Sequence, residues 1–169
     1  PMLNAFPDEL KEVNVTMGYP LRHSPVYHLV EPIINLHKNA RESSGKGDLF
    51  GGEVSYYHHD VTEVLSHPYI RMLEEVGIDR WYKEYLKRQW IFINFSQLCA
   101  AEYPALFKLL FAPVKQAGEL IHALMELLHA IRRRMEERGQ GSDLEREFVG
   151  HFFLQIKRLG DVLSAIPGG

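Results

Sequence analysis

The sequence predicts a mainly α-helical domain with two or three short strands, and three observations support this fold class. The last third of the chain carries two long apolar stripes at helical spacing. Several earlier segments begin at a capping residue or a proline, as helices do. The apolar fraction of 46% and the charged fraction of 24% are ordinary for a globular domain, and 169 residues are enough to bury a core.

We expect one domain over residues 1–169, built from three consecutive parts. Residues 1–22 would form a strand and a turn that lead in, residues 23–112 short helices with short strands, and residues 113–166 a long helical hairpin. Both ends are typical of an excerpt from a longer protein. A strand-like segment lies close to one end, and the other end follows directly on an apolar helical pattern.

The first part of the chain holds one predicted strand and one predicted helix. Residues 13–17 (VNVTM) alternate apolar and polar side chains, which predicts a short strand that ends at residues 18–20 (GYP). Ser24 is suited to cap a helix whose first residue is Pro25, and apolar residues continue at helical spacing. Pro32 lies inside this helix, so we expect a kink or a free backbone carbonyl there.

Glycine-rich and aromatic segments follow. Residues 41–52, which contain SSGKG and two further glycines, predict a flexible loop. Residues 56–57 (YY) predict a short extended segment, and residues 90–94 (WIFIN), aromatic and β-branched, predict another strand. Later helical segments would have Pro104 and Pro113 in their first turns.

Three short helices are predicted between the two extended segments. The first covers residues 59–66 and breaks at the following His-Pro pair. The second covers residues 68–76 and ends at Gly77, and Asp79 is suited to cap the third.

The two last helices predict an antiparallel hairpin. The turn between them, residues 137–141 (ERGQG), is rich in glycine, and Ser142 is suited to cap the second helix. The apolar stripe of the first helix consists of Leu120, Leu124, Leu127, Leu128, Ile131 and Met135. The stripe of the second consists of Leu144, Phe148, Phe152, Ile156, Leu159 and Leu163.

No catalytic centre is expected in this chain. Cys99, the only cysteine, excludes a disulfide framework and a cysteine-based zinc or iron–sulfur site within the chain, and an inert thiol is expected. Residues 44–46 (SGK) lack the earlier glycine and the following hydroxyl of a phosphate-binding loop. Residues 7–11 (PDELK) place an aspartate and an E-x-K pair too close together to converge on a metal ion. We expect no catalytic residue, no metal site and no cofactor.

Histidines and acidic residues gather at two further places. Glu119/His122 and Glu126/His129 have the i, i+3 spacing of di-iron ligands, but both pairs share one helix and lie opposite its apolar stripe. They are therefore expected to face solvent or a partner. At residues 58–60 (HHD) a helix-capping role for one His or the Asp is favoured over metal binding, because neighbouring side chains on a helix diverge.

Two basic clusters are the candidate DNA contacts. The first consists of Lys83, Lys87 and Arg88, and the second of Arg132, Arg133 and Arg134, with Arg138 nearby. Lysine and arginine supply phosphate contacts, and the aromatic residues around the first cluster would stack on bases if they are exposed. The alternative is that acidic neighbours interrupt the charge and that the aromatic residues belong to the core. The net charge of −3 argues only against a generally basic nucleic-acid binder.

Two segments resemble a known family. Residues 13–21 (VNVTMGYPL) with residues 24–27 (SPVY) are similar to the segment NVTMGYPL…TPVY of bacterial PD-(D/E)XK nuclease-superfamily proteins of the AddB and RecB exonuclease type. Residues 56–61 (YYHHDV) and 65–70 (LSHPYI) are similar to the element YHKDVLELLSHPYI that follows in those proteins. Residues 152–159 (FFLQIKRL) resemble the family more weakly.

The resemblance implies that this chain is the helicase-like middle region of such a protein rather than its nuclease domain. In that family a degenerate UvrD-type helicase part precedes a C-terminal nuclease, so the helices here would belong to a helical insertion in the second helicase half. The implied role is DNA end processing in recombinational repair, through contact with DNA or with a partner helicase subunit. The family's ATP-binding loop, nuclease residues and cluster cysteines have no matching positions here.

Two hypotheses for function therefore remain open. The first is a non-catalytic domain of a larger DNA-repair nuclease, and the second is a free-standing helical domain that binds a protein or a ligand. In either case we expect no membrane contact, because no apolar run reaches the roughly 18 residues of a membrane span. A cytoplasmic location is expected from the single cysteine and from an N-terminal sequence without a signal-peptide pattern.

Overall fold

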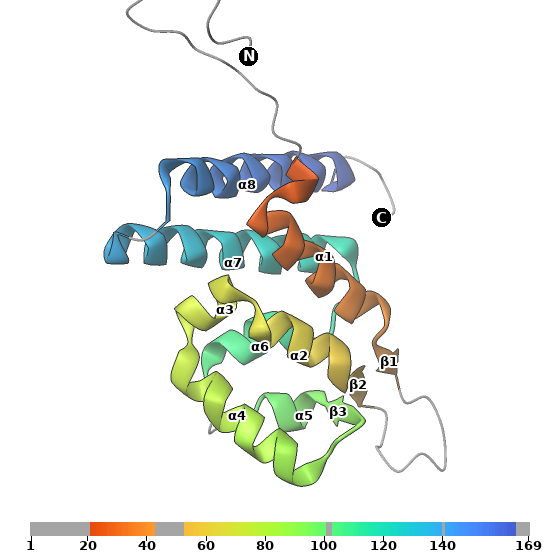
Figure 1. Ribbon diagram of the computed structural model, residues 1–169. Helices are drawn as coiled ribbons and strands as arrows, with labels where there is room; N and C mark the ends of the chain where they lie inside the picture. The colour runs from red at the N-terminus through yellow and green to blue at the C-terminus, as the bar shows by residue number, and fades with distance from the viewer. Residues whose placement is uncertain (1–20, 43–52, 101–102, 140, 165–169) are drawn as a thin grey trace, which may run out of the picture.

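The fold is mainly helical with a three-stranded antiparallel sheet, as the sequence predicts, in the residues that the computed structural model describes: 21–42, 53–100, 103–139 and 141–164. Figure 1 shows two layers. The long helices α7 (Ala117–Arg138) and α8 (Asp143–Ser164) form one layer, and the shorter helices form the other. Helix α1 (Pro25–Lys38) runs across both layers. The strand predicted at residues 13–17 lies outside the described residues.

Helix α1 begins where the sequence predicts it. The short 3-10 helix η2 (Leu21–His23) precedes it, and the buried Ser24 hydroxyl accepts a hydrogen bond from the Tyr27 N–H at 3.3 Å. The helix continues through Pro32 without a break. Five residues at helical spacing bury its inner face: Val26, Leu29, Val30, Ile33 and Leu36.

The sheet has the order β1-β2-β3 and joins segments that lie far apart in the chain. Strand β2 (Val54–Tyr57) pairs with β1 (Arg41–Glu42) on one side and with β3 (Phe92–Asn94) on the other, both antiparallel. Tyr56 lies opposite Ile93, and both side chains are buried.

Two predictions about this sheet need correction. Residues 41–42, predicted as the start of a loop over residues 41–52, instead form a strand that pairs with β2, and residues 43–52 lie outside the described residues. The strand predicted over residues 90–94 starts only at Phe92. Ile91 precedes the strand, and its carbonyl accepts a hydrogen bond from the His58 N–H.

The predicted break before Pro68 is confirmed, but the next two helices divide at a different place. Helix α2 (His58–Ser66) ends at His67, whose ring nitrogen Nδ1 caps α3 (Pro68–Leu73) by accepting the Tyr69 N–H at 3.2 Å. Helix α4 (Glu75–Arg88) then starts two residues after α3 ends.

Gly77 therefore lies inside α4 and does not end the preceding helix, contrary to prediction. The cap of α4 is Glu74, whose Oε1 accepts the Gly77 N–H at 3.0 Å, and Asp79 is an interior residue of the helix. Gly77 is needed for packing, because a Cβ at this position would overlap the ring of Pro104. A glycine that is required by a neighbouring segment has the same sequence signature as one that ends a helix.

The prolines after the sheet have different places from those predicted. Helices α5 (Phe95–Leu98) and α6 (Ala105–Phe111) follow β3, and Pro104 is the N-cap of α6 rather than a residue of its first turn. Pro113 lies in the connection between α6 and α7 and belongs to no helix.

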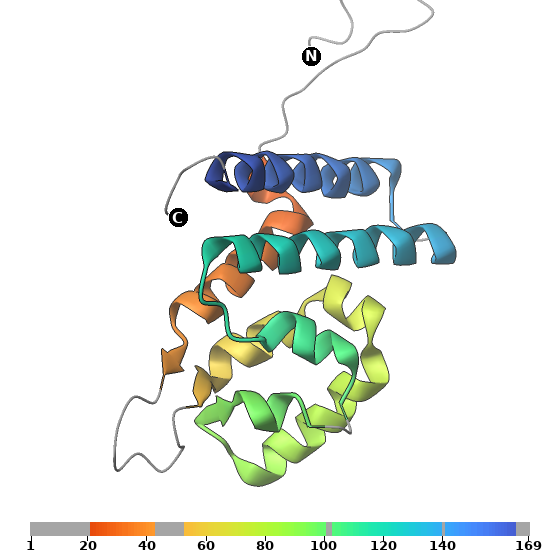
Figure 2. The same cartoon turned by 180° about the vertical axis from the view of Figure 1, so that it is seen from behind.

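The antiparallel hairpin of α7 and α8 is confirmed, with a change on each helix (Figure 2). On α7 the residues of the predicted stripe are buried except Leu120, which is half-buried. Ile121, which the prediction did not include, is buried instead. On α8 the buried residues are Val149 and Ile156, whereas Leu144 and Leu159 are more than half exposed. The apolar stripe of α8 is therefore wider than the surface that α7 covers.

The core is a single cluster that joins both layers. Its largest fully buried side chains are Trp81, Tyr56, Phe107 and Phe111. The Tyr56 hydroxyl donates a hydrogen bond of 2.8 Å to the Phe111 carbonyl, which ties β2 to the end of α6. Among the described helices, none is both long enough and apolar enough to cross a lipid bilayer.

Candidate functional site

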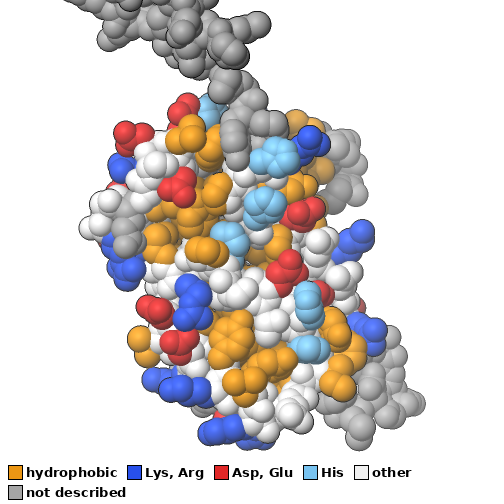
Figure 3. Space-filling view, in the orientation of Figure 1, with side chains coloured by type: hydrophobic (Ala, Val, Ile, Leu, Met, Phe, Trp, Pro, Cys, Tyr) orange, Lys and Arg blue, Asp and Glu red, His pale blue; other side chains and the backbone are white. Residues whose placement is uncertain are grey.

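Two residues of the first basic cluster, Lys83 and Lys87, lie on the outer face of α4 together with Arg80, which was not among the predicted contacts. Arg80, Lys83 and Lys87 are spaced i, i+3 and i+7, so they lie along one side of the helix, and all three are exposed. We name these three residues the α4 basic surface. The opposite side of α4 buries Ile78 and Trp81 in the core. Figure 3 shows Lys and Arg side chains at the lower edge of the molecule, where Figure 1 places α4.

Arginines at the edges of this surface hold the acidic residues of α4. Arg71 of α3 lies 2.8 Å from Asp79 and 3.7 Å from Glu75, and the Nε of Arg88 lies 2.7 Å from Glu84. The Lys87 Nζ lies farther from Glu84, at 3.9 Å. Within the part of the chain that the structure describes, Lys83 has no ion-pair partner. Its charge is therefore available to an outside anion.

The aromatic residues around this cluster belong to the core and do not form a base-stacking platform. Trp81 is fully buried and stacks on Tyr85 with 5.2 Å between the ring centroids. The Tyr82 hydroxyl donates to the Thr62 carbonyl at 3.0 Å, and the Tyr85 hydroxyl lies 2.7 Å from the His58 Nδ1. These contacts favour the alternative that the aromatic residues have a packing role.

Two further aromatic rings of this region lie next to arginines. The Arg88 guanidinium lies 5.9 Å from the ring centre of the half-buried Trp90, and the Arg41 guanidinium lies 4.4 Å from that of Phe92. Both are cation–π contacts within the fold. Arg88 is therefore engaged twice, by Glu84 and by Trp90, and is a weaker candidate for DNA contact than Lys83.

The second basic cluster, on α7, is paired with acidic residues of its own helix. Arg132 lies 3.1 Å from Glu136, and Glu137 is contacted by Arg133 at 2.9 Å and by Arg134 at 3.4 Å. Hydrogen bonds from the two arginines lower the pKa of Glu137 below its ordinary value. Helix α3 contacts both α4 and α7 and lies between the two helices that carry the basic clusters (Figure 1).

The Glu/His pairs of α7 are exposed, as their spacing predicts. Glu119 is part of the N-terminal cap, because its Oε2 accepts the Lys115 N–H at 2.7 Å. His122 lies 3.7 Å from Glu126, one turn further along. The Glu119 carboxylate thus accepts hydrogen bonds from backbone amides and does not pair with His122.

The cap predicted at residues 58–60 is not formed, since the N-cap of α2 is Tyr57 and has no side-chain hydrogen bond. Asp60 instead accepts a hydrogen bond of 3.1 Å from the Asn39 side chain at the end of α1. Ligand atoms of His59, Asp60 and Glu63 lie within 4.8 Å of one another, because Glu63 follows His59 by one turn. The first turn of a helix is unfavourable for a cation, so we assign no metal site to these three residues.

Cys99 and two half-buried histidines have altered pKa values. Burial raises the pKa of the half-buried Cys99 thiol to about 11, which keeps it protonated and unreactive at neutral pH. Burial lowers the pKa of His67 to about 4, although a hydrogen bond to the Pro25 backbone partly opposes this shift. Burial also lowers the pKa of His37, whose ring Nε2 lies 3.0 Å from the Leu110 carbonyl. Both histidines are neutral structural links between α1 and other helices.

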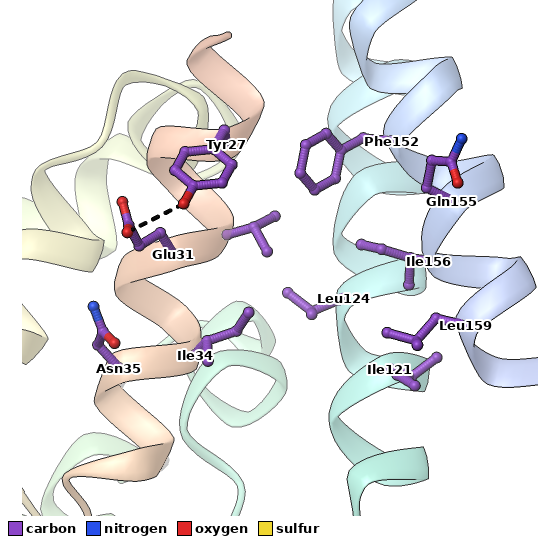
Figure 4. A pocket seen from close by; sticks show the side chains of 11 residues that line it. Tyr27, Glu31, Ile34, Asn35, Ile121, Leu124, Phe152, Gln155, Ile156 and Leu159 are labelled. Atoms are coloured by element: carbon purple, nitrogen blue, oxygen red, sulfur yellow. Dashed lines mark hydrogen bonds between the residues drawn. The ribbon is translucent and has the colours of Figure 1, made fainter. Parts of the chain in front are cut away.

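An apolar groove between α1 and the hairpin was not predicted. Figure 4 shows Tyr27 and Ile34 of α1 facing Phe152 and Leu159 of α8, with α7 beneath. The groove has a volume of about 470 Å³. One wall of the groove is part of the wide apolar stripe of α8, which the sequence shows. The second wall could not be predicted, because the sequence does not show that α1 packs beside α8.

No family model, no curated protein and no solved structure matches this chain.

Proposed function

We propose that this chain is a non-catalytic helical domain of a larger bacterial protein that processes DNA ends, and that the α4 basic surface contacts DNA. The spacing of Arg80, Lys83 and Lys87 on one exposed helix face carries the DNA contact. From the first to the last of these residues the helix rises about 11 Å. One DNA strand presents about three phosphates over such a length, so the surface suits contact with the backbone.

The link to DNA end processing rests on the two segments that resemble the nuclease family. The first segment begins α1 at Ser24 and Pro25, and the second begins α3 at His67 and Pro68. His67 contacts the Pro25 backbone, and α2 packs against both α1 and α3. The described part of the resembling residues, 24–27, 56–61 and 65–70, thus belongs to one packed unit, which supports a relationship in fold over a chance match of short segments.

The second basic cluster has a smaller part in this proposal. Arg132, Arg133 and Arg134 already have carboxylate partners on α7, so a phosphate would have to compete with Glu136 and Glu137. A contact with a partner helicase subunit is the other role that the resemblance implies.

The DNA contact is tested by fluorescence anisotropy with a labelled fork and a labelled single strand. We expect weak binding by the wild-type chain and weaker binding after Lys83→Ala plus Lys87→Ala, by a similar factor for different DNA sequences. Arg132→Ala plus Arg133→Ala is the matched control, because it removes the same number of charges from the paired cluster and should have the smaller effect. Equal losses in the two double variants would contradict the assignment to α4.

A free-standing protein-interaction domain is the second candidate, and the apolar groove beside α8 is the observation that favours it. The two candidates differ in the gene that encodes the chain. A reading frame that continues well before Pro1 and well after Gly169 supports the domain of a larger protein. A reading frame limited to these residues contradicts it.

A further inference from the structure

The groove beside α8 has apolar walls that carry one carboxylate. Tyr27 and Ile34 of α1 face Phe152 and Leu159 of α8 across the groove (Figure 4). Glu31 lies between Tyr27 and Ile34 on α1, and it is the one charged residue among the described residues that line the groove. Ile34 is 43% exposed and Leu159 is 54% exposed, so both walls offer apolar surface to an occupant.

Glu31 determines what kind of occupant the groove favours. The Tyr27 hydroxyl donates a hydrogen bond of 3.3 Å to the Glu31 Oε1. In the part of the chain that is described, no lysine, arginine or histidine forms an ion pair with this carboxylate. A wholly apolar occupant would remove the carboxylate from water without giving it a cationic partner, which is unfavourable. The groove therefore favours an apolar edge that has a cationic side chain beside it.

Helix α8 carries this combination right beside the groove. Val162 lies about 60° round the helix from Leu159, and Arg158 lies about 100° round it in the same direction. The buried Ile156 lies about 60° from Leu159 in the opposite direction. Because Leu159 faces α1, Val162 lies on the outward side of α8, and Arg158 lies on the side away from α1. Val162 is 58% exposed, and Arg158 is exposed. We name Leu159, Val162 and Arg158 the α8 ridge.

A two-fold axis fits the α8 ridge and the groove of two copies to each other. In such a contact both copies use the same surface. When the α8 ridge of one copy lies in the groove of the other, the two α8 helices run antiparallel. The side of α8 that faces away from its own α1 then faces α1 of the other copy. With the axis at the middle of residues 152–162, Arg158 lies level with Glu31 of the second copy, and the reverse pair forms at the same time.

We propose that the groove between α1 and α8 holds the α8 ridge of a second copy of this chain, in a two-fold symmetric dimer. Leu159 and Val162 bury apolar surface in the opposite groove, and Arg158 pairs with Glu31 of the second copy. Residues 152–162 span about 15 Å. The contact is therefore smaller than a standard interface, which covers about 800 Å² on each partner, and the dimer dissociates on dilution. This inference goes beyond the function proposed above and does not depend on DNA binding.

Analytical ultracentrifugation of the full chain tests the dimer. Between about 1 µM and about 1 mM, the wild type should change from one chain per particle to two. Glu31→Arg and Arg158→Glu should each raise the dissociation constant at least about tenfold, because each places like charges opposite each other at both symmetric positions. Lys157→Glu is the matched control, since it makes the same change of charge on another side of α8, and it should dimerise like the wild type.

An equal mixture of the two single variants distinguishes this dimer from a contact within one chain. In a mixed dimer each position 31 faces a position 158 of opposite charge, so the mixture should dimerise about as tightly as the wild type although neither variant does so alone. If either variant does not fold, Val162→Asp, which places a charge in the apolar contact, should also raise the dissociation constant at least about tenfold. A wild type that stays a single chain at the highest concentration would overturn the proposal. So would a mixture that stays monomeric, or single variants that dimerise unimpaired.

Discussion

Gly77 packs against the ring of Pro104, so closely that a methyl group on Gly77 would overlap Cγ and Cδ of the proline. The contact joins the first turn of α4 to the cap of α6. It fixes how α4 lies against the core, and therefore which face of α4 carries the basic residues outward.

Gly77→Ala should destabilise the protein. Overpacking of a tight contact typically costs about 1–3 kcal/mol. The gain from replacing glycine in a helix is at most about 1 kcal/mol, so the loss should win. Gly150→Ala in α8 is the matched control, because a Cβ there would meet no atom within 4 Å. Urea denaturation should show a lower midpoint for the first variant and an equal or higher one for the second, and the reverse order would contradict this packing.

Tyr56 and Tyr57 are neighbours with opposite roles. The Tyr56 hydroxyl is buried and donates to the Phe111 carbonyl at 2.8 Å, whereas Tyr57 is 42% exposed. Tyr56→Phe should lower the free energy of unfolding by about 1–2 kcal/mol, because it leaves a buried carbonyl without its donor. Tyr57→Phe should change it by less than about 0.5 kcal/mol. Equal effects in denaturant titrations would show that the buried hydrogen bond contributes nothing measurable.

Stability should fall as the pH falls, and His67 should contribute to this dependence. Burial holds its pKa at about 4 in the folded chain, below the ordinary value of 6.5. Between these two values the unfolded chain binds more protons than the folded one. The contribution is therefore fully present above pH 6.5 and is lost as the pH falls towards about 4. The lowered pKa of His37 acts in the same direction.

The variant His67→Asn separates this contribution from that of other groups. An asparagine keeps a side-chain acceptor for the Tyr69 N–H and has no proton to gain. Thermal unfolding of the variant should depend less on pH over the same interval. Wild type and variant with parallel pH profiles would show that His67 has an ordinary pKa in the folded chain.

Cys99 should react slowly with thiol reagents while the protein is folded. Its pKa of about 11 compares with an ordinary value of 9.0, so at slightly alkaline pH it holds about a hundredfold less thiolate than an exposed cysteine. The rate of reaction with an aromatic disulfide reagent should rise by a similar factor in denaturant. Equal rates in the two states would mean that the thiol is neither buried nor shifted.

Local sequence signals predict the helices of this fold well and their exact ends less well. Three predictions depend only on residues within one or two helical turns, and all three have the predicted role. They are the cap at Ser24, the break before Pro68 and the apolar stripe of α7. The local sequence predicts a helix end at Gly77, whereas the reason for this glycine, the ring of Pro104, lies far away in the chain. The spacing on α8 predicts an apolar stripe that includes Leu159, but this side chain lies beyond the surface that α7 covers and is 54% exposed.

The candidate site could be predicted only in part, for similar reasons. The positions of Lys83 and Lys87 on one helix face follow from their spacing, and both are exposed. The ion pairs that occupy Arg88 and Arg133 also follow from spacing, since their partners lie one turn away. By contrast, the role of Arg71 in holding Asp79 crosses from α3 to α4, and it depends on where these helices divide.

The most direct test of the DNA contact is the salt dependence of binding. Each phosphate neutralised on a single strand contributes about 0.7 to the slope of log affinity against log salt concentration, and each on a duplex about 0.9. Removing Lys83 and Lys87 together should therefore lower the magnitude of this slope by about 1.4 on single-stranded DNA. Removing Arg132 and Arg133 should lower it by less, because their ion pairs with Glu136 and Glu137 compete with phosphate. A slope that Lys83→Ala plus Lys87→Ala leaves unchanged would contradict DNA contact through the α4 basic surface.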